Sequence, residues 1–384
     1  MIWEIEPVTP FLIKSGNKFS LMDLYEEGNN LYRIDIDRFL QVLDKTKIDE
    51  LNKIFEDFIQ IKVSSERDKR YNRKNYDQYE KLWNALQKFY KINNAGMHKI
   101  FPPIEKDADF KRYLDFDQIM HIDMLKDNKI HEIPYIPGST IKGFIRRMLM
   151  VENFKIRNSK NRTIRIGKGS EEWDKIEMEI KSLMRHIHVS DFYPKDDFKV
   201  KMMLVIRKPK SISISMPLIY SGNFYGEVNM ININNRNENY LSKYGFNGSR
   251  EDMEETLFKI TTENSSTIIR KNREYYQNQL QIGPDDYSSL ISIGFGKGLS
   301  LSGFASIKDD FNLDLPDIKS RAKGYGSNHV KQEFPKTNFV VSYFNGQAYT
   351  DNKIGILKLN KIKKYGYLKD IEELKYLPME VRSR

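Results

Sequence analysis

The sequence predicts an α+β fold organised as two domains. Stretches that alternate apolar and polar residues, as half-buried strands do, occur near both ends and in the middle of the chain, separated by longer stretches with apolar residues at helical spacing. A length of 384 residues is enough for two substantial cores. We expect the first domain over 1–240 and the second over 241–384, with the polar, turn-rich segment 234–247 between them.

The N-terminal part predicts strands at residues 3–10 and 31–36, separated by a loop that contains Lys14, Ser15 and Lys18. Asp35 or Asp37 can cap a short helix that runs to about residue 43. A similar helical pattern recurs from residue 48 to residue 58.

Residues around 45–130 predict a helical insertion. The charged helical segment ends near residues 93–96 and has one apolar face, which should dock on the rest of the chain. That face consists of Leu82, Trp83, Leu86, Phe89 and Tyr90. Five aspartates follow, at positions 107, 109, 115, 117 and 123, but their spacing matches no calcium loop. We therefore expect no metal there.

A strand end at Tyr135 and Ile136 turns into a helix at Pro137 and Gly138, with Ser139 as a good N-cap. One face of this helix is apolar. The opposite face carries Lys142 and Arg146 one turn apart, with Arg147 beside them. Free amide groups and the positive dipole end of the helix suit a phosphate. The alternative is an ordinary amphipathic helix with a solvated basic face.

The remaining chain predicts further strands and helices in alternation. A basic loop at 158–170 precedes a helix at 171–185, and strands follow at 186–192, 200–206, 212–220 and 224–231. A long helix over 250–280 leads to a strand at 291–293. Residues 299–307 should form a helix or turn, and the tail holds two more strands, at 339–343 and 354–359.

Composition limits the classes of function. The chain is 39% hydrophobic and 30% charged, has no apolar run near the roughly 20 residues that span a bilayer, and lacks a secretory signal pattern at its start. We expect a cytoplasmic protein that does not contact membranes. The absence of cysteine excludes disulfides, cysteine-ligated zinc and a thiol nucleophile.

A net charge of +10 favours a polyanionic partner. Basic residues alternate with tyrosines in segments 67–79 and 270–276, where cations can follow a phosphate backbone while rings stack on bases. The alternative for each segment is a charged surface helix with half-buried tyrosines.

Catalytic patterns are missing from the sequence. The six histidines lie singly or on strands without an obvious acid–base partner by spacing, and no Gly-x-Ser-x-Gly elbow occurs. The balance therefore shifts toward binding. In the segment 294–298, Gly294, Gly296 and Gly298 let the backbone approach a phosphate closely, and Lys297 adds a positive charge. A tight bulge after a buried strand would require the same glycines.

Four motifs together resemble a known family. Residues 136–146, Ile-Pro-Gly-Ser-Thr-Ile-Lys-Gly-Phe-Ile-Arg, look like the helix start of the RAMP proteins of CRISPR effector complexes, and 294–298 look like their glycine-rich loop. Residues 7–16 resemble the opening strand and loop of these proteins, and 188–191 resemble their Val-Ser-Asp strand. The order of the four motifs is most similar to that in the RAMP subunit that caps the crRNA 3′ end in type III-A complexes.

The resemblance implies tandem ferredoxin-like (RRM-like) domains and a non-catalytic crRNA-binding role that supports crRNA maturation and antiviral defence. It also implies partners: crRNA, nearby target RNA, the repeated RAMP backbone subunit, the small helical subunit, and cellular nucleases. No cofactor and no metal are implied. The RNA-binding residues we expect are Lys14, Ser15, Lys18, Ser139, Thr140, Lys142, Arg146, Arg147, Gly294, Gly296, Lys297 and Gly298.

Two other functions stay open at this point. One is a RAMP-family endoribonuclease that processes crRNA or cleaves target RNA, using His186, His188 or an aspartate of the 107–123 cluster. The other is a general basic protein that binds nucleic acid outside any complex.

Overall fold

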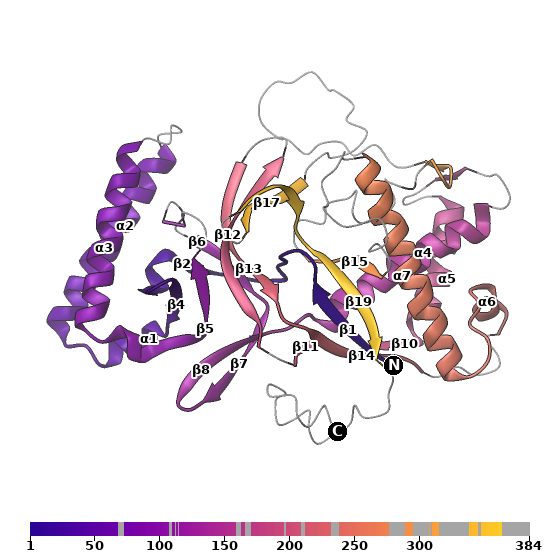
Figure 1. Ribbon diagram of the computed structural model, residues 1–384, viewed down its shortest axis with the longest axis horizontal. Coiled ribbons are helices and arrows are strands. Elements are labelled where there is room, and N and C mark those ends of the chain that lie inside the picture. The colour runs from indigo at the N-terminus through magenta and orange to yellow at the C-terminus, as the bar shows by residue number, and fades with distance from the viewer. Residues whose placement is uncertain are drawn as a thin grey trace.

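The structure is a computed structural model that describes most of the chain. The described residues are 1–67, 73–106, 110–111, 113, 115–158, 163–165, 170–195, 197–208, 212–231, 238–275, 289–294, 307, 309–314, 338–344 and 347–362. Helices and strands are mixed along the chain, which confirms the α+β class (Figure 1).

Elements up to residue 134 include more strands than the sequence predicted. They are β1 (Ile2–Pro7), β2 (Lys14–Ser20), η1 (Leu21–Asp23), β3 (Leu24–Glu27), β4 (Asn30–Ile34), α1 (Ile36–Gln41), α2 (Lys45–Arg67), α3 (Arg73–Ile92), η2 (Ala95–His98), β5 (Lys99–Lys106), β6 (Asp115–Ile119), β7 (His121–Lys126) and β8 (Lys129–Pro134).

From residue 138 onward the elements follow the predicted order closely. They are α4 (Gly138–Asn158), β9 (Ile164–Arg165), α5 (Glu171–Met184), β10 (Ile187–Val189), β11 (Tyr193–Pro194), β12 (Lys199–Lys208), β13 (Ile212–Ser221), β14 (Phe224–Met230), α6 (Glu238–Lys243), α7 (Arg250–Tyr275), β15 (Leu290–Ser292), β16 (Leu313–Asp314), β17 (Asn338–Phe344), β18 (Gln347–Lys353) and β19 (Ile356–Ile362).

A six-stranded sheet forms the centre of the molecule. Its order is β10-β14-β1-β19-β15, with β11 also pairing with β14, and every neighbouring pair is antiparallel. Helix α4 contacts β10, α7 contacts β14 and β15, and the two helices contact each other. Figure 1 shows α4, α5 and α7 grouped together beside this sheet. The succession β1, α4, β10, β14 and α7 is consistent with a ferredoxin-like unit.

Aromatic packing fixes the central strand in this sheet. Trp3 of β1 is 1% exposed and meets the ring of Phe258 on α7 edge to face, with the ring centroids 5.6 Å apart. Phe11, just beyond β1, packs in the same way on Phe224 of β14. Burial of such side chains stabilises a fold by roughly 1.5–3 kcal/mol each. The N-terminal strand is therefore held from both of its faces and both of its edges.

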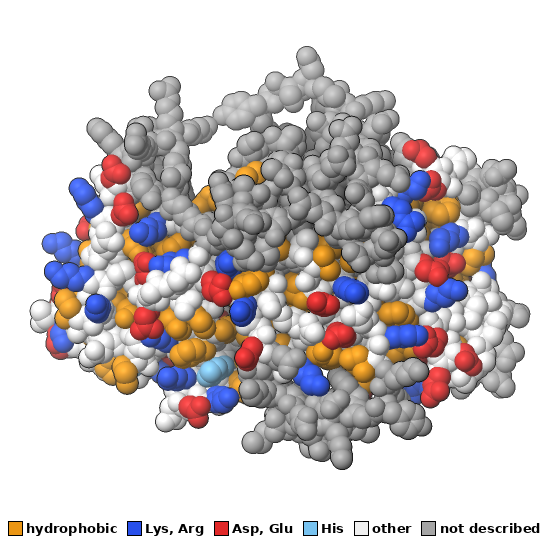
Figure 2. Space-filling model, viewed as in Figure 1, with side chains coloured by type: hydrophobic (Ala, Val, Ile, Leu, Met, Phe, Trp, Pro, Cys, Tyr) orange, Lys and Arg blue, Asp and Glu red, His pale blue; other side chains and the backbone are white. Residues whose placement is uncertain are grey.

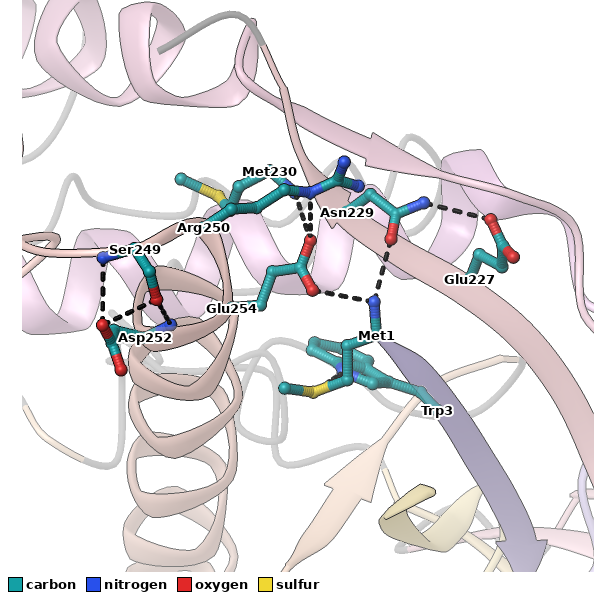
Figure 3. A network of polar contacts seen from close by, with 9 residues as sticks. All are labelled: Met1, Trp3, Glu227, Asn229, Met230, Ser249, Arg250, Asp252 and Glu254. Carbon is teal, nitrogen blue, oxygen red and sulfur yellow. Dashed lines mark hydrogen bonds and ion pairs between the residues drawn. The ribbon is translucent and has the colours of Figure 1, made fainter. Parts of the chain in front are cut away.

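A polar network also ties the start of β1 to α7 and β14 (Figure 3). The Met1 amino group donates to Glu254 Oε2 at 2.8 Å and to Asn229 Oδ1 at 2.9 Å. Glu254 Oε1 accepts from Arg250 and from the Met230 amide. The Glu254 side chain is only 6% exposed. Burial acts to raise the pKa of Glu254, but these hydrogen bonds outweigh burial and lower it.

A second, nine-stranded sheet lies beside the first. Its main path is β18-β17-β12-β5-β4-β3; β13 pairs with β12, and the β7–β8 hairpin joins through β5. Both large sheets combine strands from the two sides of residue 240: β1 pairs with β19, and β12 pairs with β17. The two halves of the chain are therefore joined by backbone hydrogen bonds.

Helices α2 and α3 pack against each other at one end of the molecule (Figure 1). All five residues of the predicted apolar face lie on α3. Trp83, Leu86, Phe89 and Tyr90 are buried and Leu82 is partly buried, so that part of the insertion is confirmed. The helices end at Ile92, and residues 99–134 form strands instead. Asp35 accepts from the Arg38 amide and caps α1.

The loop expected around Lys14 is instead the strand β2, which pairs with β6. Its residues Lys14, Ser15, Gly16 and Asn17 contain no apolar alternation, which is why the pattern in the sequence predicted a loop. Among the described helices, none has the length and apolar character that crossing a lipid bilayer requires.

Candidate nucleic-acid interface

The helix that carries the basic residues begins one residue earlier than predicted. Helix α4 starts at Gly138, so Ser139 lies inside its first turn and is exposed rather than acting as the N-cap. The Pro137 carbonyl accepts from the Thr140 amide at 2.8 Å and from the Ile141 amide at 3.4 Å. The N-cap prediction for Ser139 is wrong because the backbone of Pro137 already provides the first helical acceptor.

A carboxylate from another strand occupies the start of this helix. Asp191, which follows β10, accepts from the Gly138 amide through Oδ1 at 2.7 Å. A Cβ on residue 138 would lie 2.6 Å from the carbonyl oxygens of Val189 and Ser190, so only glycine allows this approach. The positive end of the α4 dipole is therefore partly neutralised inside the protein. The amides expected to be free for a phosphate already have partners.

The basic residues of α4 lie in three different environments. Arg146 is exposed and forms an ion pair with Glu177 of α5 at 3.3 Å. Arg147 lies over the Phe144 ring at 5.8 Å, and burial lowers its pKa. Lys142 forms no ion pair with any carboxylate in the described part of the chain. Of the three, Lys142 is the residue whose charge is most available to a phosphate.

The described glycine of the glycine-rich loop lies against the N-terminal segment. Gly294 has φ +82°, and a Cβ there would lie 2.6 Å from the Leu12 carbonyl oxygen. Both its conformation and its contact therefore require glycine. Gly296, Lys297 and Gly298 lie outside the described residues, and their predicted contacts with RNA stay predictions.

Backbone hydrogen bonds connect this glycine to the start of α4. Ile13, next to Leu12, accepts from the Met120 amide at 2.7 Å, and Met120 in turn accepts from the Tyr135 amide at 3.1 Å. Tyr135 lies three residues before Gly138. The three predicted pieces of the RNA site, at residues 14–18, 138–147 and 294, are thereby joined through short backbone links, as the motif resemblance implies.

Lys14 and Ser15 lie half-buried on β2, and Lys18 is exposed. Lys14 forms an ion pair with Asp117 of β6 at 2.5 Å. This pair holds β2 and β6 together and partly neutralises the charge predicted to meet RNA. Lys18 therefore has the more accessible charge of the two lysines.

Two tyrosines line the approach to α4. Tyr135 and Tyr193 stack with their ring centroids 5.7 Å apart and an angle of 24° between their planes. Burial raises the pKa of Tyr193 to about 12, and the negative charge of Asp191 and the neighbouring Tyr135 add to this effect. Both hydroxyls are therefore neutral hydrogen-bond donors at physiological pH. The sequence analysis missed this pair and the capping role of Asp191.

The described histidines have structural neighbours. His186 Nδ1 lies 3.2 Å from the Ile231 carbonyl oxygen, and His131 stacks on Phe101. His188 is exposed at the edge of the six-stranded sheet. None of these three is positioned by another described histidine or carboxylate as a general acid–base pair would be.

One histidine and two carboxylates meet between β7 and β8. His121 Nε2 lies 3.3 Å from Asp123 Oδ1 and 3.5 Å from Glu132 Oε1. Arg33 of β4 forms an ion pair with the same Glu132 oxygen. The guanidinium supplies the positive charge that a metal ion would bring to this group, so we assign no metal to it. Of the predicted aspartates, only Asp123 belongs to this cluster; Asp107 and Asp109 lie outside the described residues.

Comparisons with known proteins agree with the resemblance of the motifs. The structure is similar to one chain of a cryo-EM structure of a Csm-crRNA-target RNA ternary complex in a type III-A CRISPR-Cas system, with a TM-score of 0.56 and 14% sequence identity. That match covers 94% of this chain and 100% of that chain. A crystal structure of T. onnurineus Csm5 aligns with a TM-score of 0.49 and 14% identity, over 92% of this chain and 99% of that one.

No curated protein sequence matches this chain. A family model does: the model of the RAMP superfamily matches residues 4–302, which include all four motifs. The glycines at positions 138 and 294 and the strand–helix succession around β1 are the structural basis of that match. The chain therefore belongs to the RAMP superfamily.

Proposed function

We propose that the chain is a crRNA-binding subunit of a type III-A CRISPR effector complex and caps the crRNA 3′ end. The observation that carries this proposal is the full-length likeness to a chain of the Csm-crRNA-target RNA complex, in which the match covers 94% and 100% of the two chains. A shared fold does not fix a function by itself. The arrangement of the motif residues adds support from this chain.

The RNA seat we propose lies where Lys18, Lys142 and the Gly294 turn come from neighbouring segments. Lys142 has no described acidic partner, and Lys18 is exposed. The start of α4 itself is capped by Asp191, so in this proposal RNA is held by side chains beside the helix rather than by its terminal amides. Lysines act here as point charges that follow a phosphate backbone.

We further propose that the subunit does not cleave RNA. The described histidines are engaged in stacking, in contacts with backbone carbonyls or in the Arg33–Glu132 group, and none is placed opposite a second acid–base group across an open groove. The partners in this proposal are crRNA, the repeated RAMP subunit and the small helical subunit. Target RNA then passes nearby, and cellular nucleases trim the crRNA.

Affinity purification of the tagged chain from its native cell tests the proposal. We expect crRNA with mature 3′ ends and other RAMP subunits to co-purify, at a yield well above that from an untagged strain. Purification of the chain without RNA and without other subunits would contradict the assignment. Incubation of the pure chain with repeat-containing RNA, with magnesium or with EDTA, tests the non-catalytic part, because specific cleavage by the chain alone would contradict it.

The RNA seat is tested by Lys142→Ala against a matched control. Each lost phosphate contact on single-stranded RNA lowers the magnitude of the salt slope, d log K/d log[salt], by about 0.7. We expect that change for Lys142→Ala and no change for Lys259→Ala, because Lys259 is an exposed lysine of α7. Equal behaviour of the two variants, with normal melting curves, would place the RNA elsewhere.

A further inference from the structure

An uninterrupted row of aromatic side chains crosses the outer face of the nine-stranded sheet. The row consists of Tyr25 of β3, Tyr32 of β4, Phe101 of β5 and His131 of β8. Tyr25 and Tyr32 are direct cross-strand partners, and so are Phe101 and His131. The Tyr32 and Phe101 rings meet edge to face at 5.5 Å, and Phe101 stacks on His131 at 5.3 Å. Four neighbouring strands therefore contribute one ring each.

The inner face of the same strands shows why these rings point outward. Side chains alternate along a strand, so Arg33, Ile100 and Glu132, each next to a member of the row, point inward. Ile100 is 8% exposed, and Arg33 and Glu132 form their ion pair on that face. All four rings of the aromatic row are only half-buried. They are thus an accessible layer and not part of the hydrophobic core.

Lysines lie directly over the rings. Lys99 Nζ is 4.6 Å from the Tyr32 ring centroid and 5.3 Å from that of Tyr25, and Lys129 Nζ is 5.2 Å from the Phe101 ring centroid. Lys99 also pairs with Glu27 at 2.7 Å, whereas Lys129 is exposed and has no acidic partner among the described residues. In the view of Figure 2, Lys and Arg side chains and a histidine gather among hydrophobic ones at the lower left, where the β7–β8 hairpin lies.

A groove of about 250 Å³ runs beside the row, between η2 and the tip of the β7–β8 hairpin. Its charged lining comprises Arg38, Lys99 and Lys129 with one carboxylate, Asp35. Asp35 is already held by the Arg38 amide and side chain. The volume is just below the roughly 300–1,000 Å³ of small-molecule pockets, which fits one nucleotide unit and excludes a duplex.

The electrostatics around His131 agree with an anionic ligand. The groups that act on it are Lys126, Asp127 and Lys129, all at the hairpin tip. Burial lowers the pKa of His131, and the two lysines lower it further against the opposing effect of Asp127. The lysines therefore outweigh the aspartate at this position, and the local potential is positive. His131 is a neutral ring at physiological pH.

We propose that the aromatic row and its adjacent groove bind a single-stranded RNA segment, with bases against the rings and the phosphates near Lys129 and Arg38. Base–aromatic contacts contribute without strict sequence preference because every base has a π face, and cations interleaved with rings follow the backbone. The combination of rings, cations and groove distinguishes this surface from an apolar protein-docking face, which would be depleted in lysine. The proposal adds a second RNA surface and rests on the proposed function only in that RNA is the ligand.

Fluorescence anisotropy of a labelled 12-nucleotide oligouridine with the full chain tests this surface. The variant Tyr32→Leu/Phe101→Leu removes both rings but keeps apolar volume, and we expect it to weaken binding about tenfold, the effect of losing roughly one base–ring contact. The matched control Tyr32→Phe/Phe101→Tyr keeps both rings and should retain wild-type affinity. Lys129→Ala should lower the magnitude of the salt slope by about 0.7.

Several outcomes would overturn the proposal. One is a leucine variant that melts normally and binds within twofold of wild type. Another is unchanged RNA binding with loss of a co-purifying protein, which would make the face a protein-docking surface. If Lys142→Ala weakens binding and the row variants do not, the proposed function stands and this inference fails. If wild-type protein binds no RNA, both fail.

A second measurement covers the case in which the leucine variant does not fold. Ultraviolet crosslinking of the wild-type chain to 4-thiouridine RNA, followed by mass spectrometry, should identify peptides that contain Tyr32, Phe101 or His131. Crosslinks confined to peptides around residues 14–18 and 138–147 would contradict the assignment.

Discussion

The start of α4 and the aromatic row both offer groups that suit RNA, but they differ in what those groups already contact. At α4, the Gly138 amide donates to Asp191, the next free amides donate to Pro137, and Arg146 pairs with Glu177. In the aromatic row, the rings are half-buried and Lys129 has no described acidic partner. The motif that first suggests a phosphate seat is largely satisfied within the protein, whereas the open surface carries no recognisable motif.

The difference teaches that a sequence motif can record a packing requirement as readily as a ligand. Gly138 is needed because two carbonyl oxygens lie where a Cβ would stand. Nothing comparable constrains Lys129 or Tyr32, whose neighbours leave room for another molecule. Four experiments, taken from the largest expected effect to the smallest, would break or sharpen this comparison.

Gly138→Val should have the largest effect. The new side chain would collide with the carbonyl oxygens of Val189 and Ser190 at 2.6 Å, and backbone cannot move aside as a side chain can. We expect a loss of about 3 kcal/mol in the free energy of unfolding, measured by chemical denaturation.

Gly143→Ala is the control for that variant. No atom lies within 4 Å of the position of a Cβ at residue 143, which is exposed in the same helix. Alanine there should stabilise the protein by about 0.5–1 kcal/mol because glycine is unfavourable inside a helix. If both variants behave alike, the contact between α4 and β10 is not the constraint described above.

Glu254→Gln should have the next largest effect, about 2 kcal/mol of destabilisation, because the Met1 amino group and Arg250 lose a buried charged partner. The pKa of Glu254 is below its ordinary 4.5 in the folded chain. Its stabilising contribution is therefore complete above about pH 4.5 and is lost as the pH falls through the folded-state pKa. Denaturation midpoints of the two proteins should converge as the pH falls from 5 to 3; a constant difference would contradict this account.

Asp191→Asn tests whether the start of α4 can bind phosphate once its internal carboxylate is neutralised. We expect about 1 kcal/mol of destabilisation, since a charged hydrogen bond at a helix N-terminus becomes a neutral one. Affinity for oligouridine should change less than twofold, because RNA in our proposal contacts side chains. An increase of tenfold would show instead that Asp191 competes with a phosphate for the helix terminus.

The smallest expected effect concerns pH and the aromatic row. The pKa of His131 lies below its ordinary 6.5, mainly through burial and then through Lys126 and Lys129. His131 is therefore uncharged from pH 8 to pH 7, and RNA affinity at constant ionic strength should be flat there. A rise in affinity over that range which His131→Phe abolishes would mean that the imidazole is charged and binds as a cation.

Local patterns predicted much of the fold. The apolar positions Ile141, Phe144, Ile145, Met148 and Leu149 are all buried on α4, and Asp35 caps α1 as expected. Strands at residues 31–36, 200–206 and 212–220 correspond to β4, β12 and β13. These elements are determined by residues within one or two turns, so a single stretch of sequence contains the whole signal.

What the sequence did not reveal depends on partners far along the chain. The cap of α4 comes from Asp191, 53 residues away, and β2 is a strand because β6 lies beside it. The aromatic row is assembled from four strands between residues 24 and 134, and each contributes a single ring that looks unremarkable in its own segment. Only the register between strands places those rings together.

The position of β1 has a consequence for synthesis of the protein. Ile2 pairs with Glu227 on one side and with Ile362 on the other, so the first strand to leave the ribosome is completed only by two of the last. At roughly 5–20 residues per second, the apolar side chains of β1 wait tens of seconds for their neighbours. A chain that stops before residue 356 would expose one edge of the central strand, which is the kind of surface on which partly made proteins aggregate. Yield in the cell should therefore depend on how well that first strand is shielded during translation.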